Sequence, residues 1–321
     1  NIAILDNAKD ETTQIIISKF ESSEYFDIER TLNSNKEIEA AFKSGKIKLA
    51  VVFQPDFQNE LLHSNKAQIQ LIADATDPNQ ATTLVNYATS IIIDYQNDLN
   101  GLNKLPYTIN TELRMLYNPE LKGAYSSVPG VMGMILLLIS TMMTSISIVR
   151  EKELGTMEIL LVSPMKPFLV IISKVIPYFV ISLINVATIL FLSVHILGMP
   201  IQGSTILLIA ITILYIFCAL SLGILISTIT DSQLAAMLIS LLGLMLPVVM
   251  LSGYVFPVAN MPIILQVLSN IVPAKWYIIM VKSVMIKGLG INGIWRESLI
   301  LFGMTIFFIA ISLKRFKIRL T

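Results

Sequence analysis

The residues of this 321-residue sequence that could carry covalent chemistry are few. Ser252 stands beside Gly253, and with His195 as its base it could act as the nucleophile of an intramembrane hydrolase. Serine beside glycine is, however, common where membrane helices pack closely, and a single histidine near the end of an apolar segment is usually an interfacial residue. The hydrolase is therefore the weaker reading of these residues.

Two further patterns suggest a binding site. Asp74 and Asp77 could bind a cation, although two carboxylates that follow a strand are usually a solvated turn. Gly288–Gly293 fits the Gly-x-Gly-x-x-Gly pattern, but no buried strand precedes it, as a dinucleotide site requires. The sequence lacks a Gly-x-x-x-x-Gly-Lys-Ser/Thr loop, and it holds one cysteine and two histidines. We expect no catalytic residue, no metal and no cofactor in this chain.

Composition indicates the element type that must position the remaining candidates. Hydrophobic residues make up 54% of the chain, charged residues 14%, and the mean hydropathy is +0.71. A soluble domain carries about 25% charged residues, so an ordinary cytosolic enzyme and a disordered protein are both excluded. Residues 1–127 hold 11 basic and 17 acidic residues, whereas residues 128–321 hold 12 and 5. An acidic domain of mixed polarity is thus joined to a basic, apolar one.

The second part reads as a polytopic α-helical membrane protein. A helix needs about 20 apolar residues to cross a bilayer, and five segments qualify: about 128–149, 174–197, 203–229, 233–256 and 294–313. Residues 257–292 are predicted to be a re-entrant segment, in which breaks at Gly253, Pro257, Pro262 and Pro273 are candidate gating positions. Because the chain opens without an apolar leader, we expect a first transmembrane helix to precede residue 1.

Short loops rich in lysine and arginine face the cytoplasm in membrane proteins. The link after the first span carries Arg150, Lys152, Lys166 and Lys174, and the tail after the last carries Lys314, Arg315, Lys317 and Arg319. Both are therefore predicted to be cytoplasmic. An odd number of spans then places residues 1–127 on the extracytoplasmic side and the C-terminus in the cytoplasm.

Residues 1–127 predict an extracytoplasmic α/β domain. Strand-like runs cover 2–5, 47–53 and 69–73, with a weak edge candidate at 25–28. Helical patterns lie between them at 11–20 and 36–42, and a third follows the cap Asp77-Pro78. Strands that alternate with helices favour an α/β sandwich, and about 125 residues suffice for a core of its own.

The link at residues 150–166 is the most informative stretch. A charged cluster, Arg150–Glu153, closes the first span, and Gly155 interrupts the chain. Thr156 is a plausible cap for a short helix with an apolar stripe that includes Leu160 and Leu161, and Glu158 suits its first turn. Such a helix could lie along the lipid surface or dock in a partner's groove, and physics alone favours neither.

This stretch resembles the type-2 ABC exporter permeases, whose pattern is matched by Arg150–Glu153, Gly155–Glu158 and Leu160–Pro164. Further matches are Tyr117–Glu120 before Val128–Gly130, Asp74–Asn79, and Ser252–Pro257 with Asn260–Pro262. The resemblance implies that residues 150–166 transmit movement from an ABC ATPase on a partner chain, which binds ATP and Mg²⁺. The coupling residues implied are Arg150, Glu151, Glu153, Gly155, Thr156, Glu158, Leu160 and Leu161.

The resemblance also implies a bacterial inner membrane protein whose partners are the ATPase, membrane lipids and a second permease, identical or not, with no nucleic acid. Ionisable residues are scarce inside the spans, so an amphiphilic, drug-like or lipid-like substrate is expected rather than a bare ion. The alternative function is a membrane receptor that senses a ligand through the α/β domain. It too would need a partner at residues 150–166, because the predicted cytoplasmic parts are too small to hold an effector.

Overall fold

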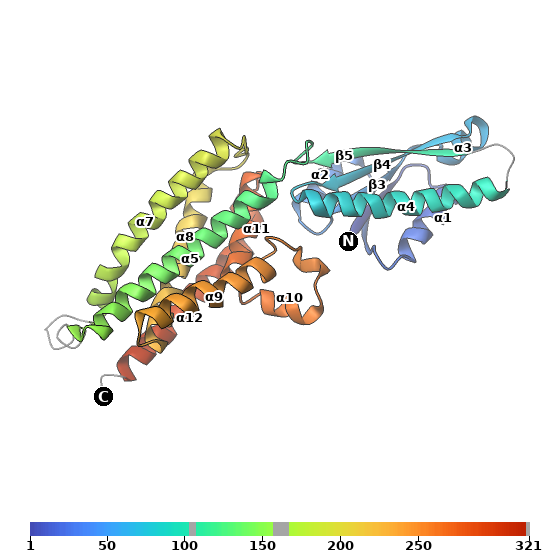
Figure 1. Cartoon of the computed structure of the whole chain (residues 1–321). Coiled ribbons are helices and arrows are strands. Elements are labelled where there is room, and N and C mark those ends of the chain that lie inside the picture. The colour runs from blue at the N-terminus through green and yellow to red at the C-terminus, as the bar shows by residue number, and fades with distance from the viewer. Residues whose placement is uncertain (103–106, 157–166, 319–321) are drawn as a thin grey trace. The chain divides into compact units, whose positions relative to one another are not determined.

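The computed structural model describes residues 1–102, 107–156 and 167–318, and the chain divides into two compact units, residues 1–123 and 124–321 (Figure 1). The first contains a mixed α/β sheet and the second a bundle of long apolar helices. The predicted combination of an α/β region with a polytopic helical membrane part is confirmed in this form.

The α/β domain is built on a five-stranded sheet with the strand order β2-β1-β3-β4-β5. Strands β1, β2 and β3 are parallel, whereas β4 is antiparallel to β3 and parallel to β5. Strands β1 and β3 are buried along their whole length, as expected for apolar strands covered on both faces. The strands are β1 (Ile2–Asp6), β2 (Ile28–Leu32), β3 (Leu49–Phe53), β4 (Lys66–Asp74) and β5 (Thr108–Leu116).

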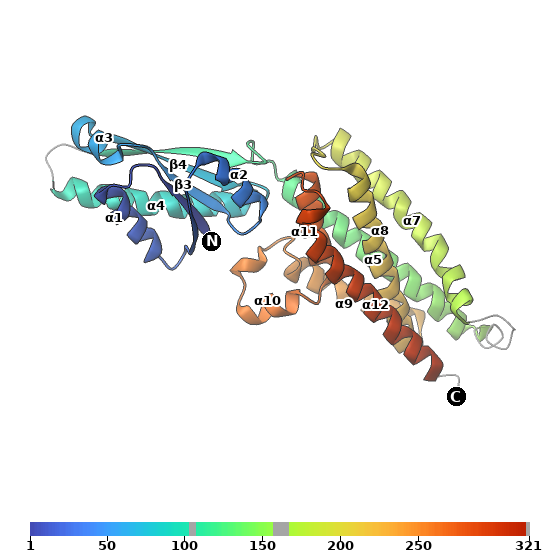
Figure 2. The same cartoon turned by 180° about the vertical axis from the view of Figure 1, so that it is seen from behind.

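Helices cover the two faces of this sheet unequally (Figure 2). Side chains of α1 (Glu11–Glu21), α3 (Phe57–Ser64) and α4 (Pro78–Leu102) build the larger core on one face. On the other face α2 (Asn35–Lys43) packs a smaller core against β1, β2 and β3, to which β4 contributes only Ile72. The part of this face that belongs to β4 and β5 is therefore left largely without a helical cover.

The sequence prediction missed one strand of this domain and misplaced another. It had no strand at residues 108–116, where β5 forms the edge of the sheet, and it put the opposite edge at 25–28 instead of Ile28–Leu32. Both are edge strands that carry several polar residues, so their hydrophobic signal is weak. Helix α3 was likewise not predicted.

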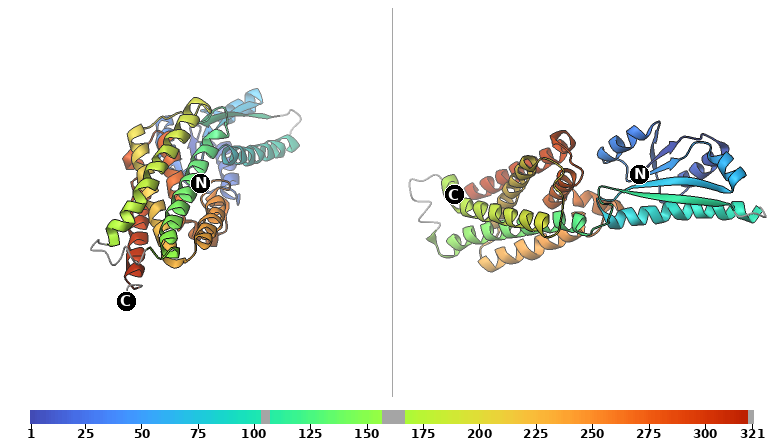
Figure 3. Two further views of the ribbon diagram at one scale, coloured as in Figure 1. Left: turned by 60° about the vertical axis from the view of Figure 1, so that its left-hand side comes forward. Right: turned by 90° about the horizontal axis from the view of Figure 1, so that it is seen from above.

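Within the described ranges, five helices are long and apolar enough to cross a membrane. Figure 3 shows the bundle from two further sides. More than half of the apolar stretch of α5 and of α8 is buried (56% and 61%), against 11–17% for α7, α9 and α12. Helices α5 and α8 therefore form its centre. The helices are α5 (Ala124–Glu153), α7 (Pro167–His195), α8 (Thr205–Ile229), α9 (Gln233–Leu251) and α12 (Trp295–Ile318).

Three hydroxyl contacts connect α5 to its neighbours inside the bundle. Ser140 Oγ lies 2.7 Å from Ser182 Oγ on α7, and Ser145 Oγ lies 3.0 Å from Ser240 Oγ on α9. Thr141 donates to the carbonyl of Ala219 on α8 at 2.9 Å. Small hydroxyl residues allow such close approach between membrane helices and supply hydrogen bonds where water is absent.

The region between α9 and α12 is broken into short pieces. The pieces are η1 (Val258–Asn260), α10 (Ile263–Ser269), α11 (Pro273–Met285) and η2 (Ile291–Gly293). Helices α10 and α11 bend by 82°, which is the geometry of a broken span or a re-entrant loop. Helix α11 is well buried, and the ring of its Tyr277 stacks on Tyr215 of α8 with centroids 4.0 Å apart.

The ends of several helices differ from the predicted spans. Helix α9 ends at Leu251 rather than near residue 256, because Gly253 takes a positive φ of 77° that a helix cannot continue through. Helix α7 begins at Pro167, before the predicted 174. Pro273 does not interrupt a helix; it is the first residue of α11, where a proline fits without loss of a hydrogen bond.

Candidate functional site

The last turn of α5 is a charged cluster, Glu151–Glu153, whose three side chains contact three different helices. The helix ends there because Gly155 takes a φ of +72°, and its N–H donates to the carbonyl of Lys152 at 3.1 Å. This is the glycine-terminated end typical of α-helices. Arg150, in the same turn, is exposed.

Glu151 connects α5 to α7. Lys174 Nζ lies 2.6 Å from Glu151 Oε1, and the side chains are 35% and 21% exposed. The second carboxylate oxygen accepts a hydrogen bond from the hydroxyl of Thr156, whose oxygen also lies 3.2 Å from the Glu151 carbonyl. One carboxylate thus holds both the first charged residue of α7 and the start of the segment that follows α5.

Lys152 connects α5 to the C-terminal end of α8. Its ammonium group donates to the carbonyl of Ser227 and to that of Thr230, the latter at 3.4 Å. Carbonyl groups in the last turn of a helix have no partner inside the helix and carry partial negative charge. The lysine satisfies two of them and complements the helix dipole.

Glu153 connects α5 to the N-terminal end of α9. Its carboxylate accepts from the backbone N–H of Gln233 at 3.2 Å and from the side-chain amide of the same residue. A carboxylate at a helix N-terminus complements the positive end of the dipole. Lys152 and Glu153 therefore hold both sides of the short turn that joins α8 to α9.

The predicted coupling residues divide into two groups. Arg150, Glu151, Glu153, Gly155 and Thr156 lie in or directly after this cluster. Glu158, Leu160 and Leu161 lie outside the described residues. Their partners Lys174 and Gln233 were not predicted as site residues, because nothing local in the sequence connects positions 23 and 80 residues apart.

The predicted gating positions all stand at backbone breaks. Gly253 has positive φ, Pro257 precedes η1, Pro262 precedes α10, and Pro273 begins α11. Whether any of them moves during a transport cycle stays a prediction.

The two residues of the hydrolase alternative are each engaged on their own helix. The Ser252 hydroxyl donates to the carbonyl of Val248, and His195 Nδ1 lies 3.1 Å from the carbonyl of Phe191, on whose ring it also stacks. No hydrogen bond joins Ser252 to His195 in the part of the chain that the structure describes. Their geometry is that of helix-end packing rather than of a nucleophile and its base.

The candidate cation and dinucleotide patterns have structural roles. Asp74 is buried, forms an ion pair with Lys48 at 3.2 Å and accepts a hydrogen bond from the Thr76 hydroxyl. Asp77 accepts from the N–H of Gln80 at 3.3 Å, which caps α4. Gly288–Gly293 follows α11 rather than a strand and forms the turn into α12.

Comparison with known proteins identifies the family. The family described as ABC-2 family transporter protein matches residues 1–314. The chain is 32% identical over 266 residues to the Escherichia coli "Probable multidrug ABC transporter permease YbhS", covering 81% of this chain and 70% of that protein. It is 32% identical over 298 residues to the E. coli protein of the same description, YbhR, covering 92% and 80%.

A further E. coli relative is the "Inner membrane transport permease YhhJ", which is 30% identical over 322 residues, covering 98% of this chain and 84% of that protein. No solved structure gives a significant match. The family match covers nearly the whole sequence, from the sheet to the last long helix. The chain therefore belongs to the ABC-2 family of transporter membrane proteins.

Proposed function

We propose that the chain is the permease subunit of an ABC exporter and that an ATPase on a separate chain drives it through residues 150–166. The observation that carries this proposal is the Glu151–Glu153 cluster. Any displacement of the segment after Gly155 acts on a helix end that is bonded to α7, α8 and α9. A surface loop without such contacts would move without effect on the spans.

The proposed arrangement in the inner membrane puts the end of α5 on the cytoplasmic side and the α/β domain on the opposite side. Lysine and arginine concentrated after the first and last spans support this sidedness. The long helices α7, α9 and α12 expose most of their apolar surface, which lipid and a second permease would cover. Two permeases, identical or not, would form the translocation path.

We propose an amphiphilic, drug-like or lipid-like substrate. Helices α8 and α9 contain no acidic or basic residue, and the buried polar groups at the centre of the bundle are hydroxyls such as those of Ser140, Thr141 and Ser145. Pathways for small ions usually require ionisable groups inside the membrane. Two relatives are named multidrug permeases, which supports the same substrate class.

Substrate class can be tested in inside-out vesicles that contain the chain and its ATPase partner. ATP should drive uptake of an amphiphilic dye or a fluorescent lipid, and a partner ATPase with its phosphate-loop lysine replaced should abolish uptake. Rubidium uptake of equal size would contradict the proposed substrate, and uptake that is independent of the ATPase would contradict the mechanism. The receptor alternative has no support from the relatives; co-purification of a kinase instead of an ATPase would favour it.

Sidedness can be tested separately by cysteine labelling. The single cysteine, Cys218, is fully buried and can be replaced by alanine. In that background, Leu62→Cys on α3 and Leu154→Cys after α5 introduce thiols at positions that are 54% and 64% exposed. A membrane-impermeant maleimide applied to spheroplasts should label the first and reach the second only after lysis. The reverse pattern would overturn the proposed orientation.

A further inference from the structure

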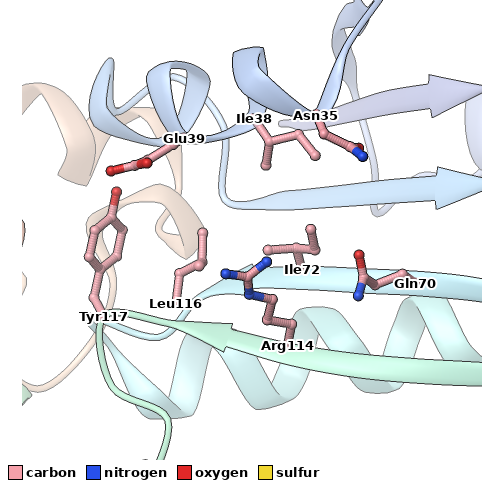
Figure 4. Close-up of a pocket in the computed structure, with 8 residues that line it drawn as sticks. All are labelled: Asn35, Ile38, Glu39, Gln70, Ile72, Arg114, Leu116 and Tyr117. Atoms are coloured by element: carbon pink, nitrogen blue, oxygen red, sulfur yellow. The ribbon is translucent and has the colours of Figure 1, made fainter.

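The α/β domain contains a pocket of about 470 Å³ beside α2, on the sheet face that α2 leaves partly uncovered (Figure 4). Its volume lies in the range of small-molecule sites. Apolar and polar side chains share its lining: Asn35, Ile38, Glu39, Gln70, Ile72, Arg114, Leu116 and Tyr117.

The strand register places the polar and apolar groups of this pocket side by side. Ile72 on β4 pairs with Arg114 on β5, and Asp74 pairs with Leu116, so these side chains share one face of the sheet. Ile72 and Ile38 are 2% and 7% exposed and form an apolar floor together with the half-buried Leu116. Arg114 extends over this floor in Figure 4.

The charge of Arg114 is not matched by a direct contact. Over the described ranges, no hydrogen bond or ion pair holds its guanidinium group. The carboxylate of Glu39 lies 2.8 Å from Lys43 Nζ, and Lys43 holds the pKa of Glu39 below its usual range, with a smaller effect from Arg114. Glu112, two residues before Arg114 on the same face, accepts from the side-chain amide of Gln68 at 3.2 Å.

Neutral hydrogen-bonding groups surround the arginine. Gln70 and Asn35 line the wall at one end of the pocket, and the Tyr117 hydroxyl lies at the other (Figure 4). Burial, with smaller effects from Asp74 and Glu39, raises the pKa of Tyr117 to about 12. The hydroxyl is therefore protonated at neutral pH and can donate a hydrogen bond.

We propose that this pocket binds an organic anion with an apolar body, whose carboxylate, sulfonate or phosphate pairs with Arg114 while its hydrocarbon part covers Ile38, Ile72 and Leu116. A guanidinium group binds such anions through two parallel hydrogen bonds. The apolar floor contributes by burial, since about 25 cal/mol is gained for each Å² of apolar surface removed from water. The assignment does not depend on the direction of transport.

The test uses the full chain in lipid nanodiscs and octanoate as the probe, with octanamide as its uncharged analogue and empty nanodiscs to subtract partitioning. Saturation-transfer NMR titrations should give saturable octanoate binding and at least about tenfold weaker octanamide binding. R114Q should weaken octanoate binding by a similar factor, and R114K should retain part of it because the charge remains.

R30Q is the matched control, because Arg30 is an exposed arginine on β2, the opposite edge of the same sheet. It should bind octanoate as the wild type does, and R114Q and R30Q should unfold at the same temperature. Equal octanoate affinity in R114Q and R30Q would overturn the proposal. So would octanamide binding as tight as that of octanoate, or the absence of saturable octanoate binding to the wild type.

Discussion

The aromatic ring of Tyr254 lies directly on Gly130. A Cβ added to Gly130 would overlap Cδ2 of the tyrosine, so only glycine allows this contact between the start of α5 and the turn after α9. The turn is formed by Gly253 at positive φ, which directs the chain out of α9. The contact therefore joins the two segments that resemble the permease pattern at Val128–Gly130 and Ser252–Pro257.

Gly130→Ala should destabilise the protein by about 1–3 kcal/mol, the usual range for overpacking. Tyr254→Ala in the same chain should recover much of that loss, because it removes the ring that the new methyl group meets. Gly303→Ala on α12 is the control, since no atom lies within 4 Å of its added Cβ. Denaturant unfolding in mixed micelles measures all four proteins, and additive losses in the double variant would contradict the contact.

Tyr215→Phe should cost about 1 kcal/mol, because it removes the 2.7 Å hydrogen bond from the Tyr215 hydroxyl to the Gly133 carbonyl in a fully buried site. The stacking of this ring on Tyr277 would remain. Tyr178→Phe on α7 should leave stability unchanged, because Tyr178 is only half buried. The same unfolding assay compares the two, and equal losses would argue against a specific role for the buried bond.

The ion pair of Glu151 with Lys174 should show a measurable coupling energy in a double-mutant cycle of Glu151→Gln and Lys174→Met. We expect about 0.5–1 kcal/mol, since both groups are partly exposed and screened. The same variants should keep ATPase activity and lower the substrate moved per ATP, because α7 loses its bond to α5. A cycle on Glu39 and Lys43, which are i,i+4 on α2, should couple more weakly and leave transport unchanged.

Gly155→Ala should strain the end of α5 by about 1 kcal/mol, because an alanine at φ +72° pays the left-handed backbone cost. No atom lies within 4 Å of the added Cβ, so the cost is conformational and not steric. Gly155→Asn should be milder, since asparagine tolerates this region better. The ratio of transport to ATP hydrolysis should fall in the order glycine, asparagine, alanine; an alanine variant that transports normally would remove Gly155 from the coupling mechanism.

The elements predicted well from sequence are those whose burial leaves a strong pattern. Long uncharged segments identify the apolar helices because the bilayer requires their length. Strand β5 was missed although Ile109, Thr111 and Met115 alternate with polar residues. Its polar positions belong to the uncovered face, so the strand reads as a loop unless the alternation itself is followed.

The site was predictable only on one side of each contact. Charged residues at the end of an apolar helix stand out, which is why Glu151 and Glu153 could be named. Their partners are a lysine at the start of α7 and a backbone N–H of α9, and these become neighbours only through the packing of α5 against both helices. The Arg114 pocket was not anticipated for the same reason: its walls come from α2, β4 and β5.

Successive side chains on an α-helix point about 100° apart, so three in a row reach around most of its circumference. Glu151, Lys152 and Glu153 occupy such a row, like spokes around a hub. A tilt or roll of the tip of α5 must then be shared among its neighbours at once, and no neighbour can follow it alone. Losing one spoke leaves two to steer, so single changes here should produce partial defects, and only the loss of all three should release the bundle from its driver.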